Sequence, residues 1–170
     1  MSGKLIPLYR AMADTKAQFF GLSVLENANT IGALLRKHKA QSIIDWGCGR
    51  GDAYKAPHKV WKQWGLSHSA FYLHDPSFPR YALEPAHVAD AVICNDVLEH
   101  VPEAEVDEFV GKLFAHASMF VWASFCNRPA KKFFPGTDVN LHCTLHDMAW
   151  WTEKFAALSG GKTFYLTESK

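Results

Sequence analysis

The stretch from residue 43 to residue 52, IIDWGCGRGD, decides the fold class of this chain. Two apolar residues lead to an acid, Asp45, and glycines then alternate with other residues at positions 47, 49 and 51. A short apolar run that ends in turn residues is typical of a strand buried on both faces of a parallel sheet. Glycines directly after such a strand let a ligand, or a packed neighbour, approach the backbone closely. The stretch therefore predicts a parallel α/β sheet with a tight turn after its first strand.

The rest of the chain extends this pattern. Apolar runs predict strands over 42–46, 70–74, 91–95 and 119–125, and a last short strand over 163–166. Apolar residues at helical spacing predict helices over 15–39, from residue 102 to 117, and over about 146–158. Strands alternating with helices predict an α/β fold: a doubly wound, mostly parallel Rossmann-like sheet with helices on both faces. We expect Pro57 to delay the helix after the first strand until near His58, because proline lacks the amide hydrogen. The spacing also predicts an abbreviated third strand around residues 81–87.

Composition limits the class of protein. Of the 170 residues, 48% are hydrophobic and 14% aromatic, which indicates one globular domain with a core. The net charge of +1 does not favour nucleic acid as a partner. The four cysteines form no C-x-x-C pair, so neither a zinc knuckle nor a disulfide framework is indicated. With no apolar run near 18 residues and no signal-peptide pattern, we expect a soluble cytoplasmic protein without membrane contact, of unknown oligomeric state.

Polar clusters follow four of the expected strands, at 45–52, 74–76, 95–100 and 124–128. In an open α/β sheet the carboxyl ends of the strands meet at one edge, where ligands bind. The dinucleotide fingerprint needs glycine where Asp52 stands, and the phosphate-binding P-loop pattern fails as well. An acid before the turn would repel a pyrophosphate and suits a ligand with an amine and hydroxyls. For this turn taken alone, a second explanation is equally good: the glycines only allow a helix to pack closely against the strand.

Three motifs together resemble the class I S-adenosylmethionine-dependent methyltransferase family. Asp45-x-Gly47-x-Gly49-x-Gly51 is similar to its first motif, and Asp75 stands where the family keeps an acid that binds the ribose hydroxyls. Residues 90–102, DAVICNDVLEHVP, resemble its fourth strand and the following turn. The resemblance covers 42–125 but leaves the adenine pocket unassigned, and Asp90 is expected to be structural. It implies S-adenosyl-L-methionine as cofactor, held by Asp45, Gly47, Cys48, Gly49, Gly51, Asp75, Pro76, Asn95 and Asp96.

Catalysis is expected just beyond the fourth-strand motif. His100 is the candidate general base, with Glu99 beside it, although a helix-entry turn would also explain this pair. Asp96-x-x-Glu99-His100 further resembles the metal cluster of small-RNA 2′-O-methyltransferases. The resemblance implies Mg²⁺ or Mn²⁺ on Asp96, Glu99, His100 and a second histidine, His142 or His146. Many metal-free methyltransferases share the same turn, so both alternatives stay open.

The segment after residue 125 is expected to form the acceptor side. Arg128, Lys131 and Lys132 stand beside two phenylalanines and could hold a phosphate, or could form a solvated loop. One domain over 1–170 is predicted: a cover helix in 1–40, a cofactor-binding core in 41–125 and an acceptor-side loop, helix and strand in 126–170. We expect O-methylation of a small-molecule acceptor such as a sugar, nucleotide or other metabolite. The alternatives are a metal-assisted RNA or nucleotide 2′-O-methyltransferase and a catalytically silent S-adenosylmethionine-binding or interaction module.

Overall fold

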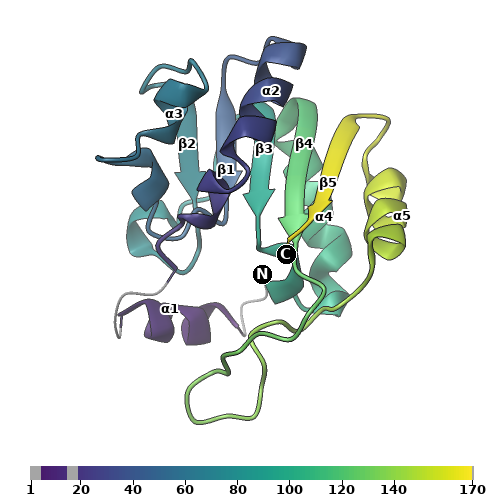
Figure 1. Ribbon diagram of the computed structural model, residues 1–170. Helices are drawn as coiled ribbons and strands as arrows, with labels where there is room; N and C mark the ends of the chain where they lie inside the picture. The colour runs from purple at the N-terminus through teal and green to yellow at the C-terminus, as the bar shows by residue number, and fades with distance from the viewer. Residues whose placement is uncertain (1–4, 15–18, 170) are drawn as a thin grey trace.

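A computed structural model describes residues 5–14 and 19–169 of the chain. In these residues one all-parallel sheet has the strand order β2-β1-β3-β4-β5 (Figure 1). Its strands are β1 (Ile43–Trp46), β2 (Phe71–His74), β3 (Ala89–Asn95), β4 (Ala117–Phe125) and β5 (Thr163–Glu168). The chain passes from β1 to β2 on one side and then to β3 on the other side of β1. The predicted doubly wound, Rossmann-like α/β fold is confirmed.

Helices cover both faces of the sheet, which explains why the strands carry continuous apolar runs. On one face α2 (Ala28–His38) and α3 (Val60–Gln63) pack over side chains such as Ile43 and Ile93. On the other face α4 (Val106–Ala115) and α5 (Met148–Leu158) pack over neighbours such as Ile44 and Val92. Adjacent residues of one strand thus belong to opposite cores, as the two-residue period of a strand requires.

The helix expected over 15–39 was wrong in its extent. Residues 15–18 lie outside the described part, and α2 begins only at Ala28, after a 3₁₀ turn at Ser23–Leu25. Phe19 and Gly21 have left-handed backbone, with φ of +54° and +68°, which a helix cannot contain. The carbonyls of Phe19 and Phe20 instead accept hydrogen bonds from the amides of Arg50 and Asp52, at 2.8 and 3.0 Å. This contact with the glycine turn overrides the helical spacing of the apolar residues.

The connections differ in length from those expected. The helix after β1 is reduced to α3, which starts at Val60 and has four residues. Between β2 and β3 the only helical or strand element described is a 3₁₀ turn at Pro79–Tyr81, so the third strand is missing there. The helix expected from residue 102 is a 3₁₀ turn at Glu103–Glu105 followed by α4. The strands and the C-terminal ends of the helices were located to within two residues, whereas α2 and α4 begin later than expected.

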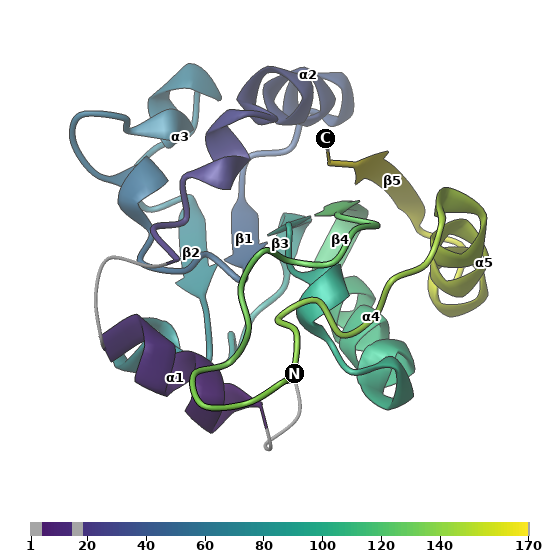
Figure 2. The same ribbon diagram turned by 60° about the horizontal axis from the view of Figure 1, so that its bottom comes forward.

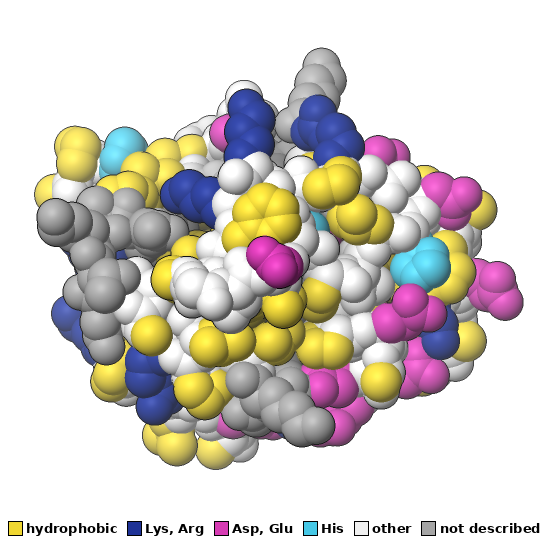
Figure 3. All heavy atoms as spheres, turned by 90° about the horizontal axis from the view of Figure 1, so that it is seen from below, with side chains coloured by type: hydrophobic (Ala, Val, Ile, Leu, Met, Phe, Trp, Pro, Cys, Tyr) yellow, Lys and Arg dark blue, Asp and Glu magenta, His cyan; other side chains and the backbone are white. Residues whose placement is uncertain are grey.

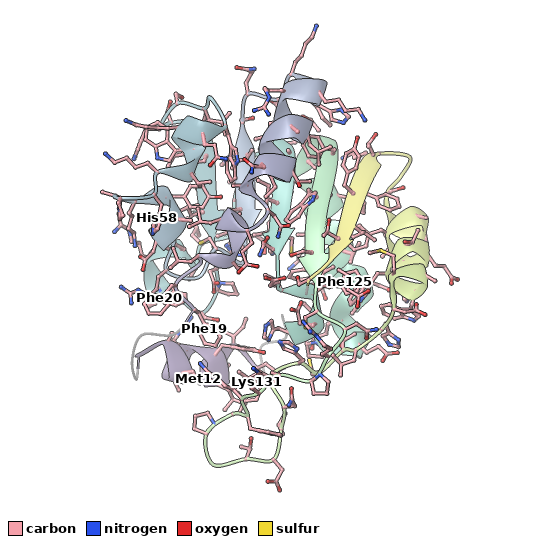
Figure 4. The ribbon with its side chains drawn as sticks, viewed as in Figure 1. Met12, Phe19, Phe20, His58, Phe125 and Lys131 are labelled. Atoms are coloured by element: carbon pink, nitrogen blue, oxygen red, sulfur yellow. The ribbon has the colours of Figure 1, made fainter. Side chains whose placement is uncertain are left out.

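A further helix, α1 (Ile6–Asp14), lies below the carboxyl ends of the strands together with the loop over 126–145 (Figure 2). Tyr9 and Met12 of α1 form a small apolar cluster with Phe134 and Leu141 of the loop. Figure 4 shows Phe19 between this layer and the sheet. No helix in the described residues has the length and apolar character needed to cross a membrane.

Candidate functional site

A cavity lies at the carboxyl ends of β1, β2 and β3, where the chain changes direction across the sheet. It is a small, half-open hollow whose wall is mainly apolar, with a few polar groups converging on it. Such a switch point is where open α/β sheets bind their ligands. Six of the expected site residues line this cavity: Gly47, Gly49, Asp75, Asn95, Asp96 and His100. The structure therefore joins segments that lie up to 53 positions apart in the sequence.

The glycine turn is tight because the chain itself packs against it. Gly47 and Gly49 have φ of +93° and +55°. A Cβ at Gly47 would lie 2.3 Å from a methyl group of Val97, and one at Gly49 would lie 2.3 Å from the carbonyl oxygen of Phe19. Both distances are shorter than van der Waals contact allows. Val97 and Phe19 of the chain itself therefore require glycine at positions 47 and 49. At these two positions the cavity wall consists of backbone alone.

Asp75 stands at the end of β2 with its carboxylate built into the turn. One oxygen accepts a hydrogen bond from the Gly49 amide at 2.9 Å, and the other accepts one from the Ser77 amide at 2.9 Å. Burial raises the pKa of this carboxyl, while the two amides act in the opposite direction. A carboxylate offers about four lone-pair sites, so two more hydrogen bonds can be accepted from a ligand.

Asn95 and Asp96 end β3 in a network of side-chain hydrogen bonds. The Asn95 amide nitrogen donates to Ser23 at 2.9 Å and to Asp96 at 3.0 Å. The hydroxyls of Ser124 and Ser169 both donate to the other oxygen of Asp96. Asp96 also has φ of +52°, a left-handed conformation that is rare outside glycine and is concentrated at functional sites. The network holds Asp96 in this conformation at the cavity wall.

Four residues expected around the cofactor do not line this cavity. Cys48 is buried, and Gly51 and Pro76 line two neighbouring hollows. Asp45 is 3% exposed and lies behind the glycine turn. Its pKa is raised to about 7, mainly by burial and in part by the charge of Asp75, while the nearby Tyr54 hydroxyl acts in the opposite direction without reaching hydrogen-bond geometry. Asp45 is thus buried within β1 and is not part of the cavity wall.

Several wall residues were missed by the sequence reasoning. They come from α1, from the segment before α2 and from the turns after β2 and β3: Tyr9, Phe19, Gly21, Ser23, Ser77, Phe78 and Val97. Of the rings in this set, only Phe78 could have been found from the sequence, because it stands three residues after Asp75 and so had to lie near the Asp75 end of the cavity. The N-terminal residues carry no such signal, because only the tertiary fold brings them to the site.

His100 occupies the end of the cavity near α1. Its Nδ1 is 2.9 Å from the Leu141 carbonyl oxygen and 2.8 Å from the Tyr9 hydroxyl, and that hydroxyl donates to the same carbonyl at 2.9 Å. A carbonyl only accepts, so we assign the ring proton to Nδ1, which leaves the lone pair on Nε2. Burial, together with the nearby His142, lowers the pKa of His100 to about 4. The ring is therefore neutral at pH 7.

Glu99, His100 and His142 form a cluster whose potential ligand atoms lie within 4.8 Å of one another. Glu99 is 1% exposed, and one of its carboxylate oxygens has no hydrogen-bond partner in the described part of the chain. Burial raises the pKa of Glu99 to about 8, and the charge of Asp96 adds to this effect. His142 Nδ1 lies 2.5 Å from the Arg128 carbonyl, so this ring also donates from Nδ1 and keeps its Nε2 lone pair.

The other residues of the expected metal set lie elsewhere. The carboxylate of Asp96 is bound by serine hydroxyls and is not in the cluster, and His146 pairs with Glu103 at 3.1 Å. Metal-binding histidines usually donate their second ring nitrogen to a carbonyl or carboxylate, as His100 and His142 do here. The unpartnered oxygen of Glu99 and these two histidines therefore fit a divalent cation, with open positions for other ligands.

The wall of the cavity has a distinct charge. Among its described residues are two acids, Asp75 and Asp96, and neither lysine nor arginine. This wall favours a ligand with positive charge and hydroxyl groups over one with a pyrophosphate. Comparison with models of protein families gives no match, and neither the curated proteins nor the solved structures contain a significant match to this chain.

Proposed function

We propose that this chain is an S-adenosyl-L-methionine-dependent methyltransferase that transfers a methyl group to an oxygen of a small acceptor. One observation carries the proposal: a single cavity at the switch point joins the glycine turn, the acid of β2, the Asn95–Asp96 pair and His100. Its acidic wall suits S-adenosylmethionine, which carries a sulfonium, an amine and two ribose hydroxyls. The sequence resemblance over 42–125 points to the same cofactor.

The wall residues fit the parts of this cofactor. The free lone pairs of Asp75 suit the ribose hydroxyls, since the carboxylate is already fixed by two backbone amides. Phe78, in the turn beyond Asp75, offers a ring for the adenine. The carboxylate of Asp96, at the cavity wall beside Asn95, suits the amine. Asp45 acts through the turn, as a positioning residue behind it.

The reaction needs little more than alignment and a proton acceptor. When bound, S-adenosylmethionine supplies a methyl on a sulfonium: as the acceptor oxygen bonds to this carbon, the carbon–sulfur bond breaks and its electron pair stays on sulfur. His100 takes the hydroxyl proton on Nε2, and its Nδ1–H bond to the Leu141 carbonyl orients the ring and stabilises the cation that forms. The Tyr9 hydroxyl of α1 stabilises this arrangement, because it contacts Nδ1 of His100 and donates to the same Leu141 carbonyl.

The experiment is isothermal titration with S-adenosylhomocysteine, followed by a methyl-transfer assay on wild-type protein and His100→Ala. We expect binding in the wild type, binding at least about tenfold weaker in Asp75→Ala, and unchanged binding but lost transfer in His100→Ala. Gln41, whose side chain is exposed at the far end of the sheet, gives the control Gln41→Ala. Absence of binding, or unchanged binding in a folded Asp75→Ala variant, would refute the proposal.

A second candidate is supported by the Glu99, His100 and His142 cluster: metal-assisted methylation of a nucleotide or RNA 2′-hydroxyl. A bound Mg²⁺ or Mn²⁺ would lower the pKa of an acceptor hydroxyl. The test measures Mn²⁺ binding by electron paramagnetic resonance, with His142→Ala against His146→Ala as the matched control. We expect His142→Ala to lose the ion and His146→Ala to keep it, and turnover that is insensitive to EDTA would contradict this candidate.

A further inference from the structure

A second groove adjoins the cavity and is lined by the segment that follows β4. Its walls come from Cys126 and residues 128–132, from Leu141 and His142, and from Phe19 and His100, and it is open to solvent on one side. Phe19 and His100 also line the first cavity, so the two hollows meet at these side chains. A molecule in this groove would therefore reach His100 next to the proposed cofactor site.

The groove is strongly positive. Arg128, Lys131 and Lys132 line it, and the described part of its wall contains neither aspartate nor glutamate. In the part of the chain that the structure covers, none of these three cations forms an ion pair. Figure 3, which views this face, shows Lys and Arg side chains mainly toward its upper and left parts and acidic side chains mainly toward the lower right. Such a separation of charge favours an anionic ligand on the basic side.

The backbone that carries these cations is held in place by hydrogen bonds. The Asn140 side chain bonds both the amide and the carbonyl of Ala130 at 2.9 Å, and His142 bonds the carbonyl of Arg128. Phe134 is 1% exposed and anchors the segment against Tyr9 of α1. Figure 4 shows Lys131 at the edge of this layer, beside α1. A charged loop that is already fixed in this way loses less conformational entropy when it binds a ligand than a flexible loop does.

We infer that the groove binds a phosphate monoester on the acceptor, so that the acceptor is a phosphorylated sugar or nucleotide. The inference rests on the proposed function, because it assigns the acceptor of that reaction. A phosphate dianion matches several cations at once, and the arginine can bind two of its oxygens. His100 lines the same groove as Lys131 and Lys132, so a molecule with its phosphate at these lysines could present a hydroxyl to His100, where the methyl would arrive. Only the hydroxyl loses a proton in the transfer, and the phosphate stays intact.

The test is calorimetric titration of the S-adenosylhomocysteine-bound protein with ribose 5-phosphate and, separately, with ribose. We expect ribose 5-phosphate to bind at least about tenfold more tightly than ribose and this preference to fall with added salt. Lys131→Gln/Lys132→Gln should remove the preference and leave S-adenosylhomocysteine binding unchanged. Lys59→Gln/Lys62→Gln, which changes one cation at the start of α3 and one within it, far from the groove, should leave both the preference and S-adenosylhomocysteine binding unchanged (Figure 1).

The outcomes separate this inference from the function on which it rests. Equal binding of ribose and ribose 5-phosphate, or an unchanged preference in the Lys131/Lys132 variant, would overturn the phosphate assignment while cofactor binding persists. Failure of the wild-type protein to bind S-adenosylhomocysteine would instead refute the methyltransferase proposal. Binding of RNA oligomers that tightens with length and weakens steeply with salt would replace the small phosphate ester by a polymer.

Discussion

Asp45 should make the stability of this protein fall as the pH rises through the weakly acidic range. Burial raises its pKa from the ordinary 3.8 to about 7. Because the folded state holds the proton more tightly than the unfolded state, the contribution of Asp45 is complete below pH 3.8 and is lost as the pH rises to 7. The slope is about 1.4 kcal/mol per pH unit, so from pH 5 to pH 6.5 the contribution of Asp45 to the free energy of unfolding should fall by about 2 kcal/mol.

The assay is urea unfolding, followed by circular dichroism, at pH 5.0, 5.5, 6.0 and 6.5. Asp75 and Glu99 also have raised pKa values and contribute slopes of the same sign, whereas the lowered pKa values of His74 and His100 contribute slopes of the opposite sign, so the wild type alone does not isolate Asp45. The comparison is therefore with Asp45→Asn, which keeps the shape of the side chain and cannot ionise. Between pH 5.0 and 6.5 the free energy of unfolding of the variant should rise by about 2 kcal/mol relative to that of the wild type. A difference between the two proteins that stays constant with pH would refute the reasoning.

Two further predictions concern the turn and α1. Gly47→Ala should lower the free energy of unfolding by at least about 2 kcal/mol, because its Cβ would strike Val97 and its φ is +93°. Gly65→Ala, with φ of +75° and open space around it, should cost only about 1 kcal/mol, and equal losses in urea unfolding would rule out the clash with Val97. Tyr9→Phe should cost about 1 kcal/mol and speed amide exchange across α1, because the bond to His100 is lost; unchanged exchange would mean that this bond does not hold α1.

The strands and the acids at their ends could be predicted because their signals are local. An apolar run followed by turn residues marks β1, β2 and β3, and the acids Asp75 and Asp96 follow directly. Gly47 and Gly49 reach the cavity wall for the same reason. Asp45 does not, because side chains alternate along a strand and this one points toward the core with Ile43.

The N-terminal wall could not be predicted, because it depends on contacts between distant segments. The left-handed backbone at Phe19 and Gly21 fits only because the glycine turn lies against it. Tyr9 reaches His100 across 91 positions of sequence, and no periodicity encodes such a contact. The Glu99–His100–His142 cluster is an intermediate case: the first two are adjacent in the sequence, whereas the choice of His142 over His146 needed the fold of the loop.

The hydrogen bonds from the glycine turn to Phe19 and Phe20 bear on how this protein could be shortened or recombined. A fragment that begins at α2 would retain every strand of the sheet and yet leave the amides of Arg50 and Asp52 without these partners. The same cut would open one side of the ligand cavity to water. Any truncation or domain exchange should therefore keep the residues before α2 and the turn after β1 together as one unit.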